Sequence, residues 1–486
     1  MSDRAIRSVA ILGGGITGLS AAAAFARALP GIAVTVIETP PDSAALADLL
    51  PGSTSTIHRF HASIGLDEPA LIRAGAAVPR LGLRFENWPA GAATWYHVHG
   101  DHGAAAGPIA FHQLWARARR EGRAEAWHCY AAAGVLAEAG RFAHPQPGTP
   151  LATFDYALRL DPARYRAVLA ALADQLRVAR VAGAFGGIER RAEGGVAALL
   201  LTDGRRVEAD LYLDASGPSA ALAAAVADGF EDWRDALPFD RVQLGESPPS
   251  AADPNDTIIG GAANGWQFVT PLPGKTLLGR IHSSAGAPDS GAPAIAIRPG
   301  RRSQPWVGNV LAVGDAAVAL DPLHWPNLHL AQSGIARAIE LLPGRDCHPV
   351  EIAEYNRRAR EETIRMRDFQ ALHYLRAGVV ITAPESLAAT LQQFERRGRL
   401  IHHDEDSLLE EIWLAALLGL GVLPVAIDSL AAAVPAAAAI AGMAEMRVGL
   451  SQLPQRLPPY ADYLVRCGVP RTWPSRRPSE PADGQG

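Results

Sequence analysis

The chain has 486 residues, which is long enough for two or three domains and a large hydrophobic core. Its composition, 48% hydrophobic and 20% charged, is that of an ordinary globular protein. The formal net charge of -5 offers no basic surface, so we expect no nucleic-acid partner.

The cysteines and apolar stretches predict a cytoplasmic protein without an integral membrane segment. Cys129, Cys347 and Cys467 are widely spaced and form no CxxC pair, so neither a disulfide framework nor a thiolate metal site is expected. The uncharged stretches 412–427 and 429–444 are interrupted by proline and glycine and are too short to span a bilayer. We expect them to form buried helices, with an apolar surface for a substrate or partner as the alternative.

A glycine-rich motif follows the first predicted strand, residues 9–12, and precedes an alanine-rich helical stretch, residues 19–29. Its members are Gly13, Gly14, Gly15, Thr17 and Gly18. In a GxGxxG turn of this kind, Gly13 permits the tight turn, Gly15 lets a pyrophosphate approach the backbone, and Gly18 allows close helix-strand packing. The helix N-terminus adds amide donors and a positive dipole end.

A second apolar run, residues 34–37, ends in Glu38. This is the expected distance for a carboxylate that accepts a hydrogen bond from a ribose hydroxyl. Together the strand, glycines, helix, strand and acid predict a dinucleotide site, whereas glycines alone would also fit a plain strand-helix connector.

Further nucleotide-binding segments are expected in the middle of the chain. A turn at 202–205 predicts a hairpin between the runs 196–201 and 207–213, and the second run leads into Asp214-Ala215-Ser216-Gly217. Another predicted strand, residues 309–313, ends at Gly314 and Asp315.

The spacing of these segments predicts one composite nucleotide-binding domain from residues 1–50, 151–217 and 300–345. Residues 51–150 and 218–299 are expected to form substrate-facing insertions, including alternating strands at 265–271 and 276–282. Residues 346–473 are expected to be helical, and 474–486 to be a disordered tail.

The set formed by Gly13 to Gly18, Glu38, Asp214 to Gly217 and Gly314-Asp315 resembles FAD-dependent monooxygenases with a glutathione-reductase-type Rossmann domain. In that class the later Gly-Asp meets the pyrophosphate and ribityl region. The resemblance implies FAD rather than NAD. It also implies an α/β fold in which an inserted β-sheet layer and a C-terminal helical region accompany the FAD domain.

Within that class, the chain resembles the flavin-dependent tryptophan halogenase family. The segments in family order are 51–54, 83–88, 95–100, 265–271, 321–323, 367–369, 373–374 and 418–421. The resemblance also implies cofactor contacts from Ser53, Thr54, Gly314, Asp315, Asn327 and Leu328.

The chain departs from the family at positions that handle hypohalous acid. Arg80 stands where the family has its lysine, and His324 stands where it has its glutamate. Trp325 and Pro326 replace small residues of the halide loop. Because an arginine guanidinium stays charged at neutral pH, it cannot act as a nucleophilic amine. We therefore expect a divergent member that lacks the catalytic lysine and glutamate and does not halogenate by the family's route.

We single out His324 and Arg80 as candidate catalytic residues. His324 would be a general base or hydrogen-bond donor, with a structural histidine as the even alternative. Arg80 would orient a substrate carboxylate, although an exposed loop arginine is the favoured alternative. Trp325 would either stack on an aromatic substrate or fill an abandoned pocket.

The segment from His97 to His102 also contains His99 and Asp101, which suggests metal ligands at first sight. It lacks a further acid-histidine set with ligand spacing, so no metal is expected. Asp161 is interpreted as the N-cap of a helix.

These features predict an FAD-dependent monooxygenase that uses O2 on an aromatic or indole-like small molecule or a peptide side chain. A separate flavin reductase is a possible source of electrons. The alternatives are a flavin oxidase or dehydrogenase, and a flavin-binding protein without catalysis. The sequence leaves the oligomeric state open.

Overall fold

The computed structural model describes residues 5–474 except 153, 193, 262–263, 287–292 and 402–406. The predicted disordered tail therefore lies almost wholly outside the described residues. Within them, one sheet has the strand order β19-β20-β11-β1-β2-β7. Its strands are β1 (Ser8–Leu12), β2 (Ala33–Glu38), β7 (Ala179–Ala182), β11 (Leu211–Asp214), β19 (Trp306–Val307) and β20 (Val310–Ala312).

This sheet is parallel except at its edge, where β19 pairs antiparallel with β20. The apolar run of β1 is buried after its first residue, as expected for a central strand of a parallel sheet. Helix α1 (Ile16–Ala28) begins directly after the glycine turn and packs against α7 (Pro162–Gln175) and α9 (Pro326–Glu340). The sheet thus joins segments that are far apart in the sequence.

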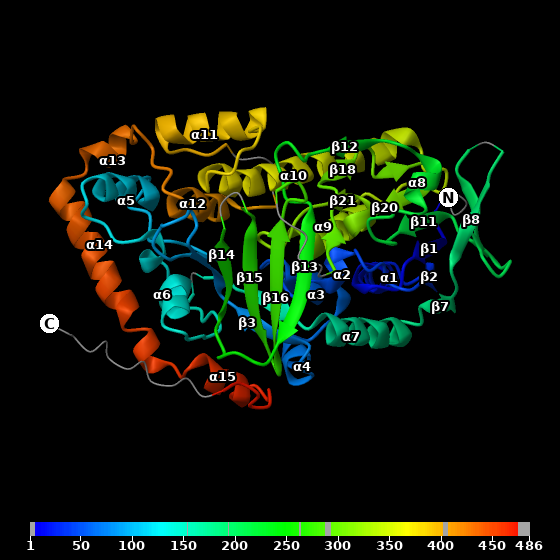
Figure 1. The fold of residues 1–486 in the computed structure, drawn as a ribbon, viewed down its shortest axis with the longest axis horizontal. Helices are drawn as coiled ribbons and strands as arrows, with labels where there is room; N and C mark the ends of the chain where they lie inside the picture. The colour runs from blue at the N-terminus through cyan, green and yellow to red at the C-terminus, as the bar shows by residue number, and fades with distance from the viewer. Residues whose placement is uncertain are drawn as a thin grey trace.

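A second, mixed sheet has the order β17-β13-β16-β15-β14-β4-β5. Its strands are β4 (Gly82–Glu86), β5 (Trp95–Val98), β13 (Arg241–Ser247), β14 (Asn255–Gly260), β15 (Trp266–Leu272), β16 (Lys275–His282) and β17 (Ile295–Ala296). Figure 1 shows its long green strands beside the first sheet. The predicted pair at 265–271 and 276–282 is confirmed as the antiparallel β15-β16 hairpin.

The remaining strands form smaller, separate sheets. They are β3 (Ala77–Arg80) with β6 (Ala157–Leu160), β8 (Phe185–Arg190) with β9 (Val196–Leu201) and β10 (Arg206–Glu208), and β12 (Phe230–Asp232) with β18 (Gly300–Arg302) and β21 (Val318–Ala319). The hairpin expected around 202–205 forms between β9 and β10. The run 207–213 is not one strand, however, because the chain leaves β10 and enters the parallel sheet as β11.

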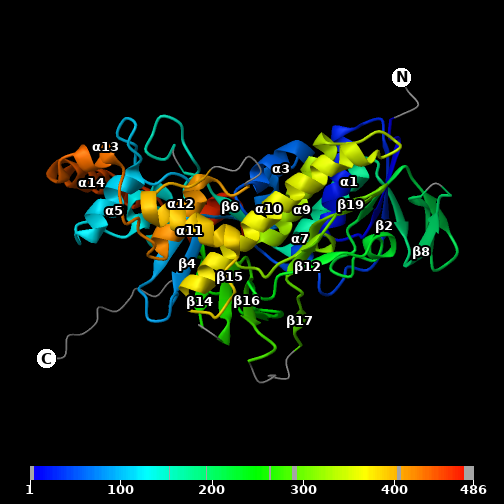
Figure 2. The same ribbon diagram turned by 90° about the horizontal axis from the view of Figure 1, so that it is seen from above.

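The helices from Pro349 onward include one that spans both sheets. Near the start of α10 (Pro349–Arg376), Tyr355 contacts Trp306 of the parallel sheet with ring centroids 5.1 Å apart. Near its end, the carbonyl of His373 accepts a hydrogen bond from Trp88. Figures 1 and 2 show α10 running across the molecule between these regions. The helix therefore links the nucleotide side to the mixed sheet.

The remaining helices are short or peripheral. They are α2 (Leu46–Leu49), α3 (Ile57–Ile64), α4 (Glu68–Arg73), α5 (Phe111–Arg120), η1 (Trp127–Tyr130), α6 (Ala132–Glu138), α8 (Ala223–Val226), η3 (Gly314–Ala316), α11 (Glu385–Arg397), α12 (Glu410–Gly419), α13 (Ser429–Ala433), α14 (Ala436–Ser451), η4 (Pro454–Arg456) and α15 (Tyr460–Arg466). The cap prediction for Asp161 is confirmed, because its side chain accepts from the backbone N–H of Arg164 at 3.1 Å.

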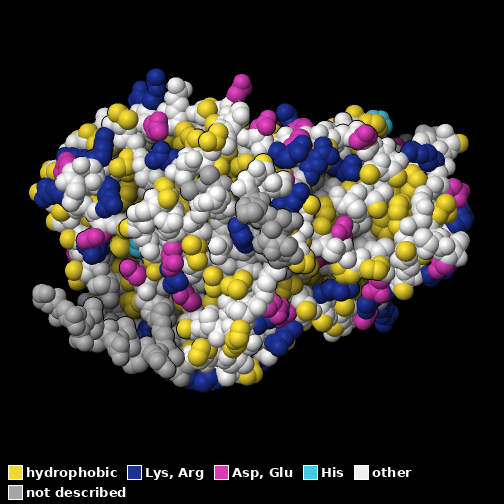
Figure 3. Space-filling model, viewed as in Figure 1, with side chains coloured by type: hydrophobic (Ala, Val, Ile, Leu, Met, Phe, Trp, Pro, Cys, Tyr) yellow, Lys and Arg dark blue, Asp and Glu magenta, His cyan; other side chains and the backbone are white. Residues whose placement is uncertain are grey.

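The two uncharged stretches behave differently. Helix α12 is buried around Trp413, as expected. The expectation is wrong for α14, in which Met443 alone is buried. Among the described residues, no helix is both long and apolar enough to cross a membrane. Figure 3 shows basic, acidic and hydrophobic side chains interspersed over one face. A cytoplasmic location stays a prediction, as do the domain boundaries.

Candidate active site

The glycine turn is closely packed at the carboxyl end of β1. Gly13 has a φ of +123°, and a Cβ there would lie 2.3 Å from the carbonyl oxygen of Ala215. A Cβ on Gly18 would lie 1.9 Å from the carbonyl oxygen of Gly13. Neither position accepts a side chain, which agrees with the turn and packing roles expected from the sequence.

Asp48 of α2 occupies the start of α1, a contact that the sequence analysis missed. Its Oδ1 accepts from the backbone N–H of Thr17 at 2.9 Å and lies 3.3 Å from the Thr17 hydroxyl. A Cβ on Gly15 would lie 1.6 Å from Asp48 Oδ2. Burial raises the pKa of the Asp48 carboxyl. The helix N-terminus therefore already holds an acidic group, as its amides and dipole favour.

Asp315, in η3, and Glu38, the last residue of β2, approach the same turn from two other segments. Asp315 Oδ2 accepts from the backbone N–H of Ala47 at 2.8 Å, and burial raises the pKa of its carboxyl to about 7. Gly314 has a φ of +60°, and a Cβ there would lie 2.9 Å from Thr17. Glu38 lies against Gly14 and pairs with Arg180 at 2.5 Å. The predicted cofactor residues from distant segments thus converge.

The other predicted cofactor residues are mostly committed to contacts within the chain. Asn327, at the start of α9, donates to the carbonyl of Leu320 at 2.9 Å, while its Oδ1 is buried without a hydrogen-bond partner among the described residues. Leu328 is buried. The hydroxyl of Ser53 donates to the carbonyl of Leu158 at 2.7 Å, and that of Thr54 lies 2.7 Å from the Thr56 hydroxyl. The glycine turn has no room for side chains, and the Asn327 amide oxygen has no partner among the described residues. Both features fit a dinucleotide cofactor.

Arg80 is buried on β3 and is not the exposed loop arginine that was favoured. Its side chain is 2% exposed. Nη2 donates to the carbonyl of Ser53 at 2.5 Å, and Nε lies 3.3 Å from Asp256 Oδ2. Arg159, on β6, donates from Nε to the other oxygen of the Asp256 carboxylate at 2.6 Å. Two buried guanidinium groups thus share one carboxylate. Burial lowers the pKa of Arg80 to about 10, so the group stays protonated at neutral pH.

Trp325 fills interior volume beside this network. Its indole N–H donates to Asp256 Oδ2 at 3.0 Å, and the side chain is 1% exposed. A Cβ on Gly52 would lie 2.0 Å from the indole, so the ring lies directly on the loop that precedes Ser53. Of the two sequence interpretations of Trp325, this position agrees with pocket filling.

His324 contacts His373 through a short hydrogen bond that defines both tautomers. The two Nε2 atoms lie 2.8 Å apart, and His373 Nδ1 lies 2.8 Å from the carbonyl oxygen of Phe369. Since a carbonyl only accepts, His373 must donate from Nδ1. Burial lowers the pKa of His373 to about 3, so its ring is neutral and its Nε2 is an acceptor. His324 must therefore donate from Nε2.

The second nitrogen of His324 is left as an acceptor. Burial first, then the nearby His373 and other basic groups including Arg80, lower the pKa of His324 well below its usual value. The neutral ring protonated at Nε2 leaves a lone pair on Nδ1. His324 has a φ of +67°, and its ring lies against Phe85, Phe369 and His97. His373 lies in a segment that matched the family order, but its partner was not foreseen.

The histidines of the segment 95–102 have separate surroundings. His97 donates from Nε2 to the carbonyl of Ile412 at 3.1 Å, and burial lowers its pKa to about 4. Neither nitrogen of His99 has a hydrogen-bond partner among the described residues. His102 stacks on Trp127 with ring centroids 4.9 Å apart. Within the described chain, these histidines and Asp101 do not converge as a set of metal ligands.

The fold and the convergent site are those of an FAD-dependent oxidoreductase. Residues 8–436 match the family described as tryptophan halogenase. BrvH, a flavin-dependent halogenase from Brevundimonas sp. BAL3, is 31% identical, with a TM-score of 0.90 over 96% of this chain and 100% of that one. Xcc4156, a flavin-dependent halogenase from Xanthomonas campestris, is 29% identical, with a TM-score of 0.88 over 98% and 100%.

A curated relative, tryptophan 7-halogenase KtzQ from Kutzneria sp. (strain 744), is 27% identical over 416 residues, or 77% of each chain. The chain therefore belongs to the tryptophan halogenase family. It is an enzyme, a flavin-dependent halogenase that uses FAD.

This result corrects the sequence-based interpretation of activity. The expectation of a monooxygenase that does not halogenate is wrong, as are its oxidase and non-catalytic alternatives. That expectation rested on the assignment of Arg80 and His324 to the family's lysine and glutamate positions, whereas the similarity to halogenases extends over most of the chain.

Proposed function

We propose that this halogenase acts on an electron-rich aromatic substrate, either an indole-like small molecule or a peptide side chain, with Arg80 and His324 in the positions of the family's lysine and glutamate. In this proposal the chain lacks the catalytic lysine and glutamate of its relatives. The observation that carries it is the surroundings of His324: a neutral imidazole, whose Nδ1 makes no hydrogen bond with a described residue, near a buried guanidinium.

Residues Gly13 to Gly18 would hold the FAD pyrophosphate, with Glu38 on the ribose and Asp315 on the ribityl region. Asn327, Leu328, Ser53 and Thr54 would complete the binding site, which we assign to the glutathione-reductase type of Rossmann domain. Bound reduced FAD, with O2 and halide, supplies hypohalous acid. A separate flavin reductase would supply the reduced flavin.

Arg80 would hold and orient the hypohalous acid rather than form a covalent adduct. Its Nη2 and Nε face Ser53 and Asp256, whereas Nη1 makes no hydrogen bond with a described residue. A protonated guanidinium is a donor without a nucleophilic lone pair. A hydrogen bond from Nη1 to the oxygen of hypohalous acid would draw electrons from the halogen and make that atom more electrophilic.

His324 would remove the proton that the aromatic carbon loses after it has gained the halogen. This proton balances the hydroxide released when the oxygen–halogen bond breaks, so that hydroxide would leave as water. The acceptor at this step is the Nδ1 lone pair. His373 would keep that lone pair available, because its own Nε2 accepts the hydrogen bond from His324 Nε2. His373 is thus a positioning residue. The low pKa of His324 keeps the ring neutral until the proton is transferred.

The test is bromination of indole and of a tryptophan-containing peptide by the FAD-loaded enzyme with a flavin reductase, NADH and bromide. Products are measured by mass spectrometry in the presence of a scavenger of free hypohalous acid. We expect His324→Ala to slow turnover about 10²- to 10⁴-fold, the usual contribution of a positioned base. His324→Glu should recover part of that loss because it restores a carboxylate base.

Arg80→Met should abolish bromination that is resistant to the scavenger, whereas Arg80→Lys should retain it. Matched controls are His144→Ala, an exposed histidine bonded to Tyr463, and Arg84→Met, a half-buried arginine on β4. Unchanged turnover in His324→Ala, or a loss explained by weaker FAD binding or a lower unfolding midpoint, would remove His324 from the chemistry.

A further inference from the structure

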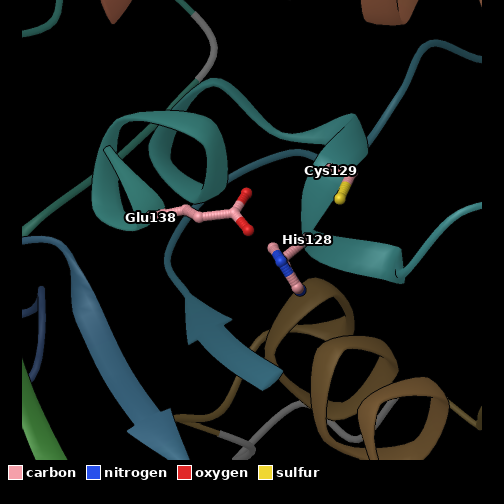
Figure 4. A group of neighbouring side chains, drawn as sticks. All are labelled: His128, Cys129 and Glu138. Carbon is pink, nitrogen blue, oxygen red and sulfur yellow. The ribbon is translucent and has the colours of Figure 1, made fainter. Parts of the chain in front are cut away.

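Three side chains with different ligand atoms meet away from the residues assigned to the active site. His128 and Cys129 lie in η1, and Glu138 is the last residue of α6. Their ligand atoms all lie within 4.8 Å of one another. Figure 4 shows the three side chains directed toward a common space between the two helices.

None of the three side chains makes a hydrogen bond or ion pair with a residue that the structure describes. His128 is 5% exposed, its ring nitrogens make no hydrogen bond with a described residue, and the ring packs against Tyr96 with centroids 4.8 Å apart. Cys129 is a free, half-buried thiol. The exposed Glu138 carboxylate makes no hydrogen bond or ion pair with a described residue. The His128 ring borders a cavity, and the three uncommitted ligand atoms lie close enough together to be available to one ion.

The backbone holds the two helices close together at this point. A Cβ on Gly134 of α6 would lie 2.1 Å from the carbonyl oxygen of His128. The absence of a side chain at Gly134 therefore allows α6 to approach η1 directly. Both elements also pack against β5, the strand that carries His97. The positions of the ligands are set by this packing rather than by a mobile loop.

We propose that His128, Cys129 and Glu138 bind a zinc ion. One nitrogen, one sulfur and one oxygen ligand suit a borderline divalent ion, and three protein ligands leave a fourth, tetrahedral position open. Zinc bonds of about 2.0–2.3 Å place neighbouring ligand atoms roughly 3.5 Å apart. The exposed side chain of Glu138 can close the remaining gap by a rotamer change.

The open position would be reached from a neighbouring cavity of about 250 Å³, to which His128 contributes. Its aromatic wall includes Trp95, Tyr96, Trp115 and Trp127. Water, or a polar group of a small aromatic molecule in this cavity, would complete the coordination. The bound ion would also link η1 to α6, both of which pack against β5.

The proposal is tested by titrating the FAD-loaded protein with ZnCl2 in a calorimeter and by measuring iodoacetamide alkylation of each cysteine by peptide mass spectrometry. Zinc should slow alkylation of Cys129 at least about tenfold, because a metal-bound thiolate is a poor nucleophile. Cys467, which is also half-buried, is the internal control and should react at an unchanged rate.

Glu138→Gln should weaken zinc binding by at least about tenfold, and His128→Asn should weaken it further. Glu125→Gln is the matched control, since Glu125 lies nearby but pairs with Arg447. Because Glu138 is exposed, its variant tests the site even if His128→Asn fails to fold. Equal protection of Cys129 and Cys467, or unchanged zinc affinity in Glu138→Gln, would refute the site.

Discussion

Removal of the Asp48 carboxylate should strengthen FAD binding. In the structure Asp48 accepts a hydrogen bond from the backbone N–H of Thr17 at 2.9 Å, and its carboxylate lies where a Cβ on Gly15 would be. In the proposed site, the FAD pyrophosphate would occupy this helix terminus. FAD would then have to displace Asp48 and lie beside its negative charge.

The expected gain follows from the contacts that FAD has to replace. A hydrogen bond to a charged group contributes about 1.5–3 kcal/mol, and the 3.3 Å contact with the Thr17 hydroxyl adds little. Since 1.4 kcal/mol is a factor of ten, Asp48→Ala should bind FAD roughly 10- to 100-fold more tightly. Asp48→Asn should show a smaller gain, because it removes the charge but keeps an acceptor.

The assay is an isothermal calorimetric titration of the flavin-free protein with FAD. Asp42→Ala is the control: Asp42 lies in the same connection, and its side chain accepts from the backbone N–H of Ala44 at 2.8 Å. It should leave the dissociation constant nearly unchanged. If Asp48→Ala binds FAD no more tightly than the parent, or more weakly, Asp48 does not compete for the pyrophosphate position.

Three further predictions concern buried charge and the glycine turn. Asp315 has a folded-state pKa of about 7 against an ordinary value of 3.8, so the folded protein keeps a proton that the unfolded chain releases between these values. The free energy of unfolding of the flavin-free protein should therefore fall as the pH rises from about 4 to about 7, and Asp315→Asn should flatten this dependence in urea titrations; a fall of the same size in the variant would contradict the assignment. Asp256→Asn leaves two buried guanidinium groups without a counter-charge and should lower the free energy of unfolding by about 3–5 kcal/mol, against about 0–1 kcal/mol for the exposed pair broken in Glu246→Gln. Equal losses in the two variants would show that the buried network is not stabilised by Asp256. Gly15→Val should abolish FAD binding in equilibrium dialysis, since its side chain would occupy the space at the start of α1; a folded variant that binds FAD normally would place the cofactor elsewhere.

Local features of the nucleotide side could be predicted because short stretches of chain determine them. The strand, turn and helix around Gly13 need a residue without a Cβ, and that requirement is visible in the sequence. The hairpin of β15 and β16 and the cap at Asp161 are likewise set by neighbouring residues. Their positions in the structure agree with those predictions.

The contacts of the proposed catalytic residues join positions far apart in the chain, and only the tertiary structure decided them. Arg80 looked like a surface arginine because nothing near it in sequence shows that Asp256 lies 3.3 Å away. The uncharged stretch of α14 looked buried, but the structure packs only one of its faces. Which ring nitrogen of His324 has a lone pair depends on its hydrogen bond with His373, which lies 49 residues away. Hydrophobic periodicity and turn preferences record the local conformation of the chain, whereas burial, ion pairing and tautomer depend on neighbours that packing alone brings together.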